Sequence, residues 1–353
     1  MGRNIPASKR GFGYDPVTRS LGVYVDGALA ASFPPTPGRT YFVNNITGAS
    51  TNDGLSWGTA MDEVSTAITA SETYRELGGQ EGGRTATTND YVRNTIMIQG
   101  TATAYTGITD LGEHVNLIGL GSPSGGRGGT IWNTTTLKGV ARIGSDTAST
   151  GGMVSTGDYH GLYIGNIHFQ TSGTSPAFEV GGIHESTIED CGFYYAMTTA
   201  GTAPDSMFHI RSGGTGATGL IMERSGCGGN AGVTDRTSYG FMVGDGVDRF
   251  SHSRMRDCFW TGWTAAYYLW STVKYCQGTI IGPHNFFGGF GHGVCNYGIL
   301  DYNKQTNPTG GLATYVDNYL DALTPMQQYP GFGFAERFIG NHDWTGLIVV
   351  SAN

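Results

Sequence analysis

Short apolar runs separated by polar, glycine-rich turns dominate the chain. The first clear run, 41–43 (YFV), is aromatic and β-branched, and the segment 44–58 that follows is dense in Asn, Gly, Ser and Asp. From Thr59 onward apolar residues recur three or four positions apart. This pattern predicts a strand, a polar turn and an amphipathic helix over about 59–77. The apolar positions of that helix are Met61, Val64, Ala67, Ile68 and Tyr74.

A six-residue template recurs later in the chain, with an apolar residue at each end and small or polar residues between. Its copies are IGNIHF (164–169), IEDCGF (188–193), MERSGC (222–227), MRDCFW (255–260) and IGPHNF (281–286). Two earlier apolar runs, 94–100 and 115–121, place Ile96 and Leu117 at equivalent positions. Repeats with variable spacing are typical of a solenoid whose loops differ in length on one side.

Stacking the copies in register predicts two inward columns of apolar side chains. Each rung would share its apolar residues with both neighbours, so a polar substitution in a column should destabilise the whole stack. The first column is Ile164, Ile188, Met222, Met255 and Ile281, and the second is Phe169, Phe193, Cys227, Trp260 and Phe286.

Composition favours an all-β fold. Glycine makes up 59 of the 353 residues and charged residues make up 14%, against about 7% and about 25% in typical soluble proteins. Aromatic residues at 12% argue against simple disorder. Many short strands joined by tight turns fit this composition.

The run N-D-G-L-S-W-G-T-A (52–60), followed by the predicted helix, resembles the N-terminal segment of right-handed parallel β-helix proteins of the pectin-lyase-like kind, which are common in phage tailspikes. The resemblance covers about 41–302. It implies an all-β, right-handed parallel β-helix over 38–302, with the helix covering the open N-terminal end of the coil. Such an end needs a cover because it exposes unpaired strand edges.

Residues 1–37 are predicted to form a separate arm. Residues 1–12 are polar without periodicity, and the strands near 21–25 and 29–33 are joined by Asp26-Gly27, a strong hairpin signal. The proline-rich 34–38 then acts as a linker. The arm resembles the virion-anchoring arm of tailed-phage structural proteins and would bind a capsid or tail protein. The alternative is a strand pair that lies on the β-helix itself. The candidate anchoring residues are the basic Arg3, Lys9, Arg10 and Arg19.

At the other end, 303–353 is interpreted as a C-terminal cap or an oligomer contact. The template fades from about Asp301, and 313–323 has the apolar spacing of a short helix that Pro325 would end.

Two carboxylates are candidate catalytic residues. Glu189 and Glu223 share the second template position, so in successive rungs they would lie about 5 Å apart, close to the separation in a retaining glycosidase. The alternative is charge pairing: Asp190, Arg224 and Asp257 alternate in sign at the third position, and Arg256 follows Glu223 in the second. Both interpretations remain open on sequence.

Aromatic residues that end or follow the template copies are candidates for binding glycans, because flat rings stack on sugar C–H faces while polar neighbours bind hydroxyls. The alternative is that these rings pack a long loop or a subunit interface. The residues are Tyr194, Tyr195, Trp260, Trp263, Tyr267 and Trp270.

Charge and motif content exclude several functions. A net charge of −8 without a Lys/Arg run argues against nucleic-acid binding, and no apolar stretch is long enough to predict a membrane span. The five cysteines lack C-x-x-C spacing and no histidine pattern predicts a metal ligand set, so we expect reduced thiols, no metal and no cofactor. The N-terminus lacks a secretory pattern, so we expect the chain to be made in the cytoplasm.

Taken together, these features predict a structural component of a tailed-phage virion, either a tailspike, a fibre-like protein or a head-decoration protein. We expect it to be a homotrimer that contacts host surface glycans. One alternative is a polysaccharide-degrading β-helix enzyme, a hydrolase or a lyase, although the calcium-binding acids and catalytic arginine of pectate lyases cannot be placed on this sequence. The other is a non-catalytic glycan-binding surface protein.

Overall fold

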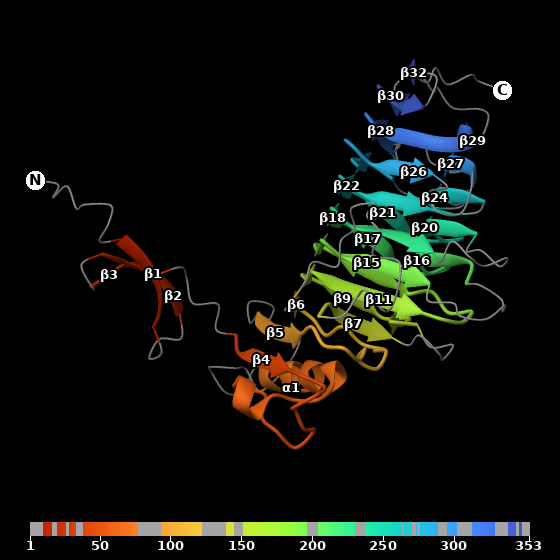
Figure 1. Ribbon diagram of the computed structural model, residues 1–353. Coiled ribbons are helices and arrows are strands. Elements are labelled where there is room, and N and C mark those ends of the chain that lie inside the picture. Colours follow the sequence, from red (N-terminus) through yellow and green to blue (C-terminus); the bar gives the residue numbers. More distant parts are fainter. Residues whose placement is uncertain are drawn as a thin grey trace, which may run out of the picture.

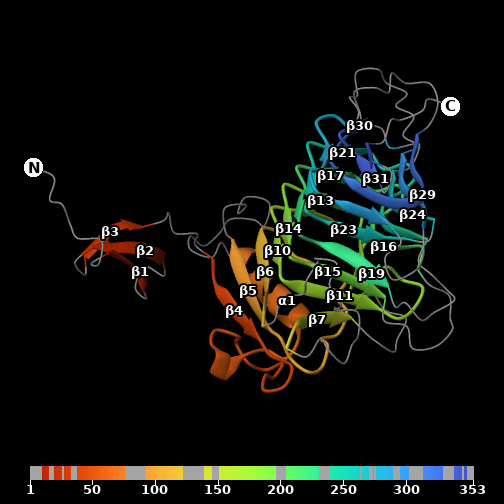
Figure 2. The same cartoon turned by 45° about the horizontal axis from the view of Figure 1, so that its top comes forward.

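The computed structural model describes residues 10–15, 20–25, 28–32, 38–76, 93–121, 139–144, 151–195, 204–229, 238–262, 264–269, 273, 276–288, 295–301, 313–328, 338–343 and 346–347. For 10–15, 20–25 and 28–32 the description is limited to the backbone. Figures 1 and 2 show the strands from β4 to β32 stacked in successive layers.

The N-terminal region forms a three-stranded antiparallel sheet of its own. Its strands are β1 (Arg10–Asp15), β2 (Ser20–Val25) and β3 (Ala28–Ser32), in that order. Val25 pairs with Ala28 across Asp26-Gly27, which confirms the predicted two-residue hairpin connection. Residues 10–12, which show no periodicity in the sequence, belong to β1. Because β1 contains two glycines and an arginine, its sequence shows no clear alternation of apolar and polar residues.

The N-D-G-L-S-W-G-T-A motif folds into a compact loop beside β4 (Thr40–Val43). Asp53 Oδ1 accepts hydrogen bonds from Leu55 N at 3.0 Å and from Thr59 Oγ1 at 2.6 Å. Phe42 N donates to Gly54 O at 2.7 Å, and Met61 N donates to Phe42 O at 2.9 Å. The motif therefore hydrogen-bonds to the edge of β4 that faces away from β5 (Asn94–Gln99).

The helix predicted from Thr59 begins later. Thr59 ends the 3-10 turn η2 (Trp57–Thr59), and Met61 forms a parallel bridge with Val43, so α1 spans Val64–Glu76. The predicted apolar face is otherwise confirmed, because Val64, Ala67 and Ile68 are buried. Figure 1 shows α1 beside β4 at one end of the stack.

Two parallel sheets run the length of the stack and a third covers part of it. The ten-stranded sheet has the order β30-β28-β25-β22-β18-β14-β10-β6-β5-β4. Its remaining strands are β6 (Val115–Leu120), β10 (Tyr163–Gly165), β14 (Thr187–Glu189), β18 (Ile221–Glu223), β22 (Arg254–Arg256), β25 (Ile280–Ile281), β28 (Thr314–Val316) and β30 (Phe338–Ile339).

The fifteen-stranded sheet has two limbs joined by β29 (Tyr319–Gln328), which pairs with β26 on one side and β27 on the other. The first limb is β7 (Ala141–Gly144), β11 (Ile167–Thr171), β15 (Gly192–Tyr195), β19 (Gly226–Gly229), β23 (Phe259–Thr261) and β26 (Phe286–Gly288). The second limb is β8 (Met153–Val154), β12 (Phe178–Val180), β16 (Ser206–Ile210), β20 (Tyr239–Val243), β24 (Ala265–Leu269) and β27 (Cys295–Asp301). At the end of the chain, β31 (His342–Asp343) pairs with β29 and, in antiparallel fashion, with β32 (Gly346–Leu347).

The third sheet has four strands, in the order β21-β17-β13-β9. They are β9 (Asp158–His160), β13 (Gly182–His184), β17 (Gly216–Thr218) and β21 (Arg249–Ser251). From β10 the chain visits the ten-stranded sheet, the two limbs and the four-stranded sheet in turn, and β14 then pairs in parallel with β10. The fold is thus mostly β, with parallel sheets, consistent with an all-β parallel solenoid.

The first predicted column is confirmed. Ile188 pairs with Ile164 and Met222, and Met255 pairs with Met222 and Ile281, all at most 2% exposed.

The second predicted column is wrong at its last member. Phe287, not Phe286, pairs with Trp260 and is buried, whereas Phe286 pairs with Phe259. The fifth copy has one extra residue, because Pro283 comes before the left-handed corner residue His284. That insertion shifts every later position of the copy by one.

Each template copy bends at a left-handed residue between the ten-stranded sheet and the first limb. The φ angles are 54° at Asn166, 53° at Asp190, 44° at Arg224 and 53° at Asp257. Asn and Asp tolerate this region better than other non-glycine residues. The third template position is therefore polar first of all because it forms a corner.

The helix predicted over 313–323 is wrong. That segment contains β28 and the start of β29, and Pro325 lies within β29. The template in fact continues as YVDNYL (315–320) and FIGNHD (338–343), since Tyr315 pairs with both Ile281 and Phe338. Asp317, at φ 46°, is the corner residue at the usual third position, and the bend there breaks the strand alternation, which gives the apolar residues a helix-like spacing. Residues 303–312 and 329–337 lie outside the described residues, and the proposed cap stays a prediction.

Buried asparagines connect these last rungs. Asn285 Nδ2 donates to Asn318 Oδ1 at 2.9 Å, and Asn318 Nδ2 donates to Asn341 Oδ1 at 2.9 Å. All three are at most 1% exposed. Each amide also binds a backbone carbonyl of another rung, such as Asn318 Nδ2 to Ile281 O at 2.9 Å. The side-chain amides thus satisfy backbone groups at the inside of the corner.

Candidate functional site

The outer face of the ten-stranded sheet carries both predicted catalytic carboxylates. Because residues alternate along a strand, the buried Ile188 and Met222 leave Glu189 and Glu223 on the opposite side. The register pairs Glu189 with Glu223 and Glu223 with Arg256. The predicted proximity of these side chains on neighbouring rungs is therefore confirmed.

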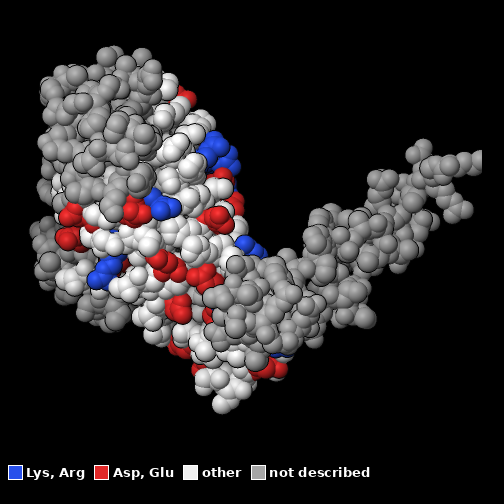
Figure 3. Space-filling view, turned by 180° about the vertical axis from the view of Figure 1, so that it is seen from behind, with Lys and Arg blue, Asp and Glu red and all other residues white. Residues whose placement is uncertain are grey.

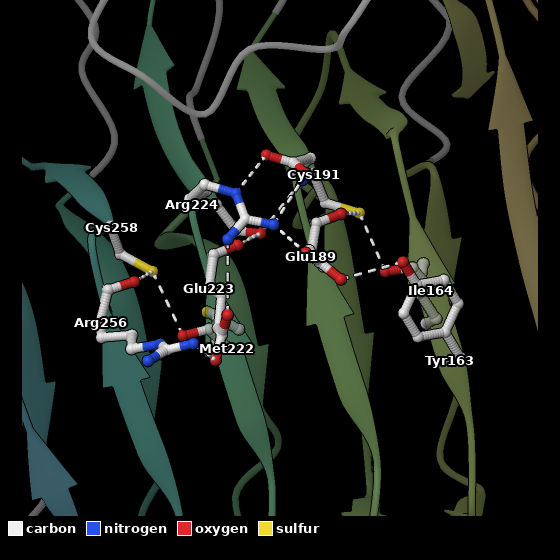
Figure 4. A network of polar contacts seen from close by, with 11 residues as sticks. Tyr163, Ile164, Glu189, Cys191, Met222, Glu223, Arg224, Arg256 and Cys258 are labelled. Carbon is white, nitrogen blue, oxygen red and sulfur yellow. Dashed lines mark hydrogen bonds and ion pairs between the residues drawn. The ribbon is translucent and has the colours of Figure 1, made fainter. Parts of the chain in front are cut away.

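Arg224 binds three carboxylates from two rungs. Its Nε donates to Asp190 Oδ1 at 2.9 Å, its Nη2 donates to Glu189 Oε1, and its Nη1 lies 3.5 Å from Glu223 Oε2. Figure 4 shows the guanidinium group lying between Glu189 and Glu223. The corner position of Arg224 brings its donors over the second-position residues of its own and the preceding rung.

Arg256 completes the network from the next rung. Its Nη2 lies 2.6 Å from Glu223 Oε1. On the far side, Tyr163 Oη donates to Glu189 Oε2 at 3.0 Å. Further along, His284 Nδ1 lies 3.2 Å from Asp257 Oδ1. The structure thus contains the Asp190–Arg224 and Glu223–Arg256 pairs that charge pairing predicted.

This arrangement is better suited to joining rungs than to catalysis. A glycosidase pair needs one carboxyl group to protonate the leaving group and another to attack or to activate water. Here all four carboxylate oxygens of Glu189 and Glu223 already have donors or cations within 3.5 Å. The catalytic assignment of Glu189 and Glu223 stays a prediction that this geometry does not favour.

The predicted aromatic loop cluster is wrong for three of its residues. Tyr194, Trp260 and Tyr267 lie in β15, β23 and β24 and are at most 2% exposed. Trp260 stacks on Phe193 with ring centroids 5.8 Å apart, and its Nε1 donates to Met255 Sδ at 3.1 Å. Buried rings of this kind cannot meet a glycan at the surface.

The remaining predicted aromatics and the anchoring residues are not tested. The Tyr195 side chain, Trp263 and Trp270 lie outside the described residues, as do Arg3, Lys9 and Arg19. Arg10 is the first residue of β1.

One aromatic residue that the sequence interpretation missed is Tyr163. It precedes the buried Ile164 in β10, is half-buried, and lies on the outer face beside Glu189. Burial raises the pKa of its hydroxyl above the usual value of about 10. The available signal was an aromatic residue followed two positions later by glycine, a combination that the other template copies lack.

A second polar cluster lies on the four-stranded sheet. The His160 and His184 rings stack with centroids 4.8 Å apart. Thr215 Oγ1 donates to Asp158 Oδ1 at 2.6 Å and lies 3.0 Å from His184 Nε2. Burial, and then the neighbouring His160, lower the pKa of His184. Across the described parts of the chain, no group of three or more His, Cys, Asp or Glu residues is placed to hold a metal ion.

The four cysteines with described side chains are buried and form no disulfide: Cys191, Cys227, Cys258 and Cys276. Burial raises the pKa of the first three to about 12, so their thiols stay protonated and unreactive at neutral pH.

Figure 3 shows acidic side chains spread over the described surface of one face, with fewer basic ones among them. Within the described ranges, no helix has the length and apolar character needed to cross a bilayer. Comparison with protein-family models, curated proteins and solved structures gives no match to this chain.

Proposed function

We propose that this protein is a structural component of a tailed-phage virion, with a right-handed parallel β-helix as its body and α1 as the N-terminal cap. The cyclic order of the strands and their parallel register support the coil. Right-handedness follows from the strong preference of parallel crossover connections for that hand. The packing of Val64 and Ile68 into the core at the β4 end supports the cap.

The single observation that carries the anchoring role is the register of the N-terminal sheet. Phe12 pairs with Val23 and Val23 with Ala31, and Tyr14 pairs with Leu21. Directly paired residues share a face of an antiparallel sheet. The opposite face receives Gly13, Gly22 and Ser32, Asp15 and Ser20, together with Gly11, Tyr24 and Leu29.

A three-stranded sheet whose Phe12 face is largely apolar needs a second layer to bury that face. Its strands pair only with one another among the described strands. A capsid or tail protein that supplies the missing layer would anchor the body. In a chain whose net charge is −8, the arm carries the basic residues Arg3, Lys9, Arg10 and Arg19. These residues would add contacts to an acidic surface of the partner.

Deletion of 1–37 tests this function. We expect a folded body that is absent from purified particles. Val23→Asp, on the apolar face, should also prevent incorporation, whereas Ser20→Asp, on the opposite face, should not. Normal incorporation of the deletion variant, or its failure to fold, would contradict the anchoring role.

We also propose that the body forms a homotrimer that contacts host surface glycans. Sedimentation as a monomer at micromolar concentrations would contradict the trimer. The enzymatic alternative predicts that the protein releases reducing ends from bacterial polysaccharides. The ion pairs that already occupy the carboxylate oxygens of Glu189 and Glu223 argue against it. A glycan-binding surface protein outside the virion would bind sugars but be absent from particles.

A further inference from the structure

The Tyr163 ring lies over a glycine on the outer face of the ten-stranded sheet. A Cβ atom placed on Gly165 would come within 2.8 Å of Tyr163 Cε1 and 3.0 Å of its Oη. No side chain could occupy that position without displacing the ring. Figure 4 shows the ring face-on, in front of the strand and next to Glu189.

Two contacts fix this orientation. The backbone of Gly165 supports one side of the ring, and Tyr163 Oη donates to Glu189 Oε2 at 3.0 Å. Glu189 is in turn held by Arg224. The ring is thus held in place before any ligand binds, so little side-chain entropy remains to be lost on binding.

Polar side chains border the ring on both neighbouring rungs. Asn116 and Thr187 pair in register with Tyr163, and all three are half-buried. Asn116 Oδ1 accepts from Arg93 Nη1 at 3.1 Å, and Asn116 Nδ2 donates to Thr95 Oγ1 at 3.1 Å. The Asn116 amide is therefore fixed as well.

We propose that Tyr163 and these bordering groups form a subsite for one neutral hexopyranose unit of a surface glycan. The C–H face of the sugar would stack on the ring, while Thr187, Asn116 and Glu189 bind its hydroxyls. This inference rests on the proposed function, in which the body contacts host glycans.

The charges on the Glu189 side of the ring favour a neutral sugar over an acidic one. On the Glu189 side the charged groups are the carboxylates of Glu189 and Asp190 and the guanidinium of Arg224, and on the Asn116 side the guanidinium of Arg93. Arg224 already donates to both carboxylates and lies 3.5 Å from Glu223. On the Glu189 side a sugar carboxylate would thus meet like charges whose cation is already paired, whereas Arg93, at the Asn116 edge, donates to a neutral amide.

The test is titration of the full-length protein with matched hexasaccharides, followed by saturation-transfer NMR and calorimetry. The neutral probes are hexamers of glucose, mannose and galactose, and hexagalacturonate is the acidic counterpart of the galactose hexamer. We expect one neutral hexamer to bind with saturation transfer strongest at the protons of one sugar face, and hexagalacturonate to bind more weakly.

Variants separate stacking from folding. Tyr163→Ala should weaken binding roughly tenfold, whereas Tyr163→Phe keeps the ring and should stay within about threefold. Gly165→Val should weaken binding although Tyr163 is present, because the new side chain displaces the ring. Ile221→Ala is the matched control, since Ile221 lies on the same face and is 39% exposed.

The proposal is overturned if no neutral hexamer binds at concentrations up to about 10 mM, since a dissociation constant of that size corresponds to a binding free energy on the order of 3 kcal/mol. It is also overturned if Tyr163→Ala binds as well as wild type, or if hexagalacturonate binds best. Incorporation into particles is a separate readout. Wild-type protein that is absent from particles would contradict the virion role while leaving the sugar site intact.

Discussion

Asp190 and Arg224 hold the same left-handed corner position in neighbouring rungs, and Arg224 Nε donates to Asp190 Oδ1 at 2.9 Å. Aspartate is common in this conformation, but a long side chain such as arginine is not. The strain of a non-glycine residue there is on the order of 1 kcal/mol. The ion pairs of Arg224 with Asp190, Glu189 and Glu223 offset that strain.

Two substitutions at Arg224 separate the strain from the ion pairs. Both Arg224→Ala and Arg224→Gly remove the guanidinium, but glycine adopts a φ of 44° without steric cost. We expect the alanine variant to be less stable than the glycine variant by about 1 kcal/mol in urea unfolding. Equal stabilities would show that the corner is unstrained.

The inward column predicts a sharp contrast between adjacent residues in β18. Met222 is 1% exposed and Ile221 is 39% exposed. Met222→Ala should lower the free energy of unfolding by about 2–5 kcal/mol, because it leaves a cavity shared by two rungs. Ile221→Ala should change it by less than about 0.5 kcal/mol. Similar losses for both variants would contradict the assigned register.

The asparagine ladder predicts a cost at Asn318. Its side chain donates to Asn341 Oδ1 and Ile281 O and accepts from Asn285 Nδ2. Asn318→Ala leaves buried polar groups without these partners, at a cost of about 1–3 kcal/mol each. Thermal unfolding should show a clear loss, whereas Asp317→Asn, at the exposed corner next to it, should be nearly neutral. A stable Asn318→Ala protein would mean that the rung relaxes around the change.

The sequence predicted the parts of the fold that depend on local periodicity. The pairing of Ile96 with Leu117 and the first inward column follow from the recurrence of the template. The extra residue before His284 and the corner at Asp317 were missed, because one residue of altered backbone conformation changes the inward–outward alternation. The continuation of the template beyond 301 was therefore read as a helix.

The candidate site was predictable only in part, for a different reason. Register alone brought Glu189 next to Glu223, so their proximity followed from the sequence. Whether an aromatic residue reaches the surface depends on which face of its strand it occupies and on what covers that face. Trp260 and Tyr267 are buried for that reason, whereas the position of Tyr163 over Gly165 is evident only in the three-dimensional structure.

His168 in β11 is a buried titratable group with a strong effect on acid stability. It is 3% exposed, and it pairs in register with Arg142 on the neighbouring strand. Burial, and then the charge of Arg142, lower the pKa of His168 to about 3. Its ring centroid lies 5.5 Å from that of Tyr194.

The lowered pKa sets the sign of the pH dependence. In the unfolded chain His168 takes up a proton near pH 6.5, but in the folded protein it stays neutral until about pH 3. Between these values the unfolded state binds one more proton, so stability falls as the pH falls, by about 1.4 kcal/mol per pH unit. The stability that His168 contributes is thus fully present above pH 6.5 and is lost toward pH 3.

The substitution His168→Leu removes this pH-dependent contribution. The difference in unfolding free energy between wild type and variant should therefore shift in favour of the variant as the pH is lowered from 7.5 to 4.5. Parallel curves for wild type and His168→Leu would show that His168 becomes protonated inside the folded protein.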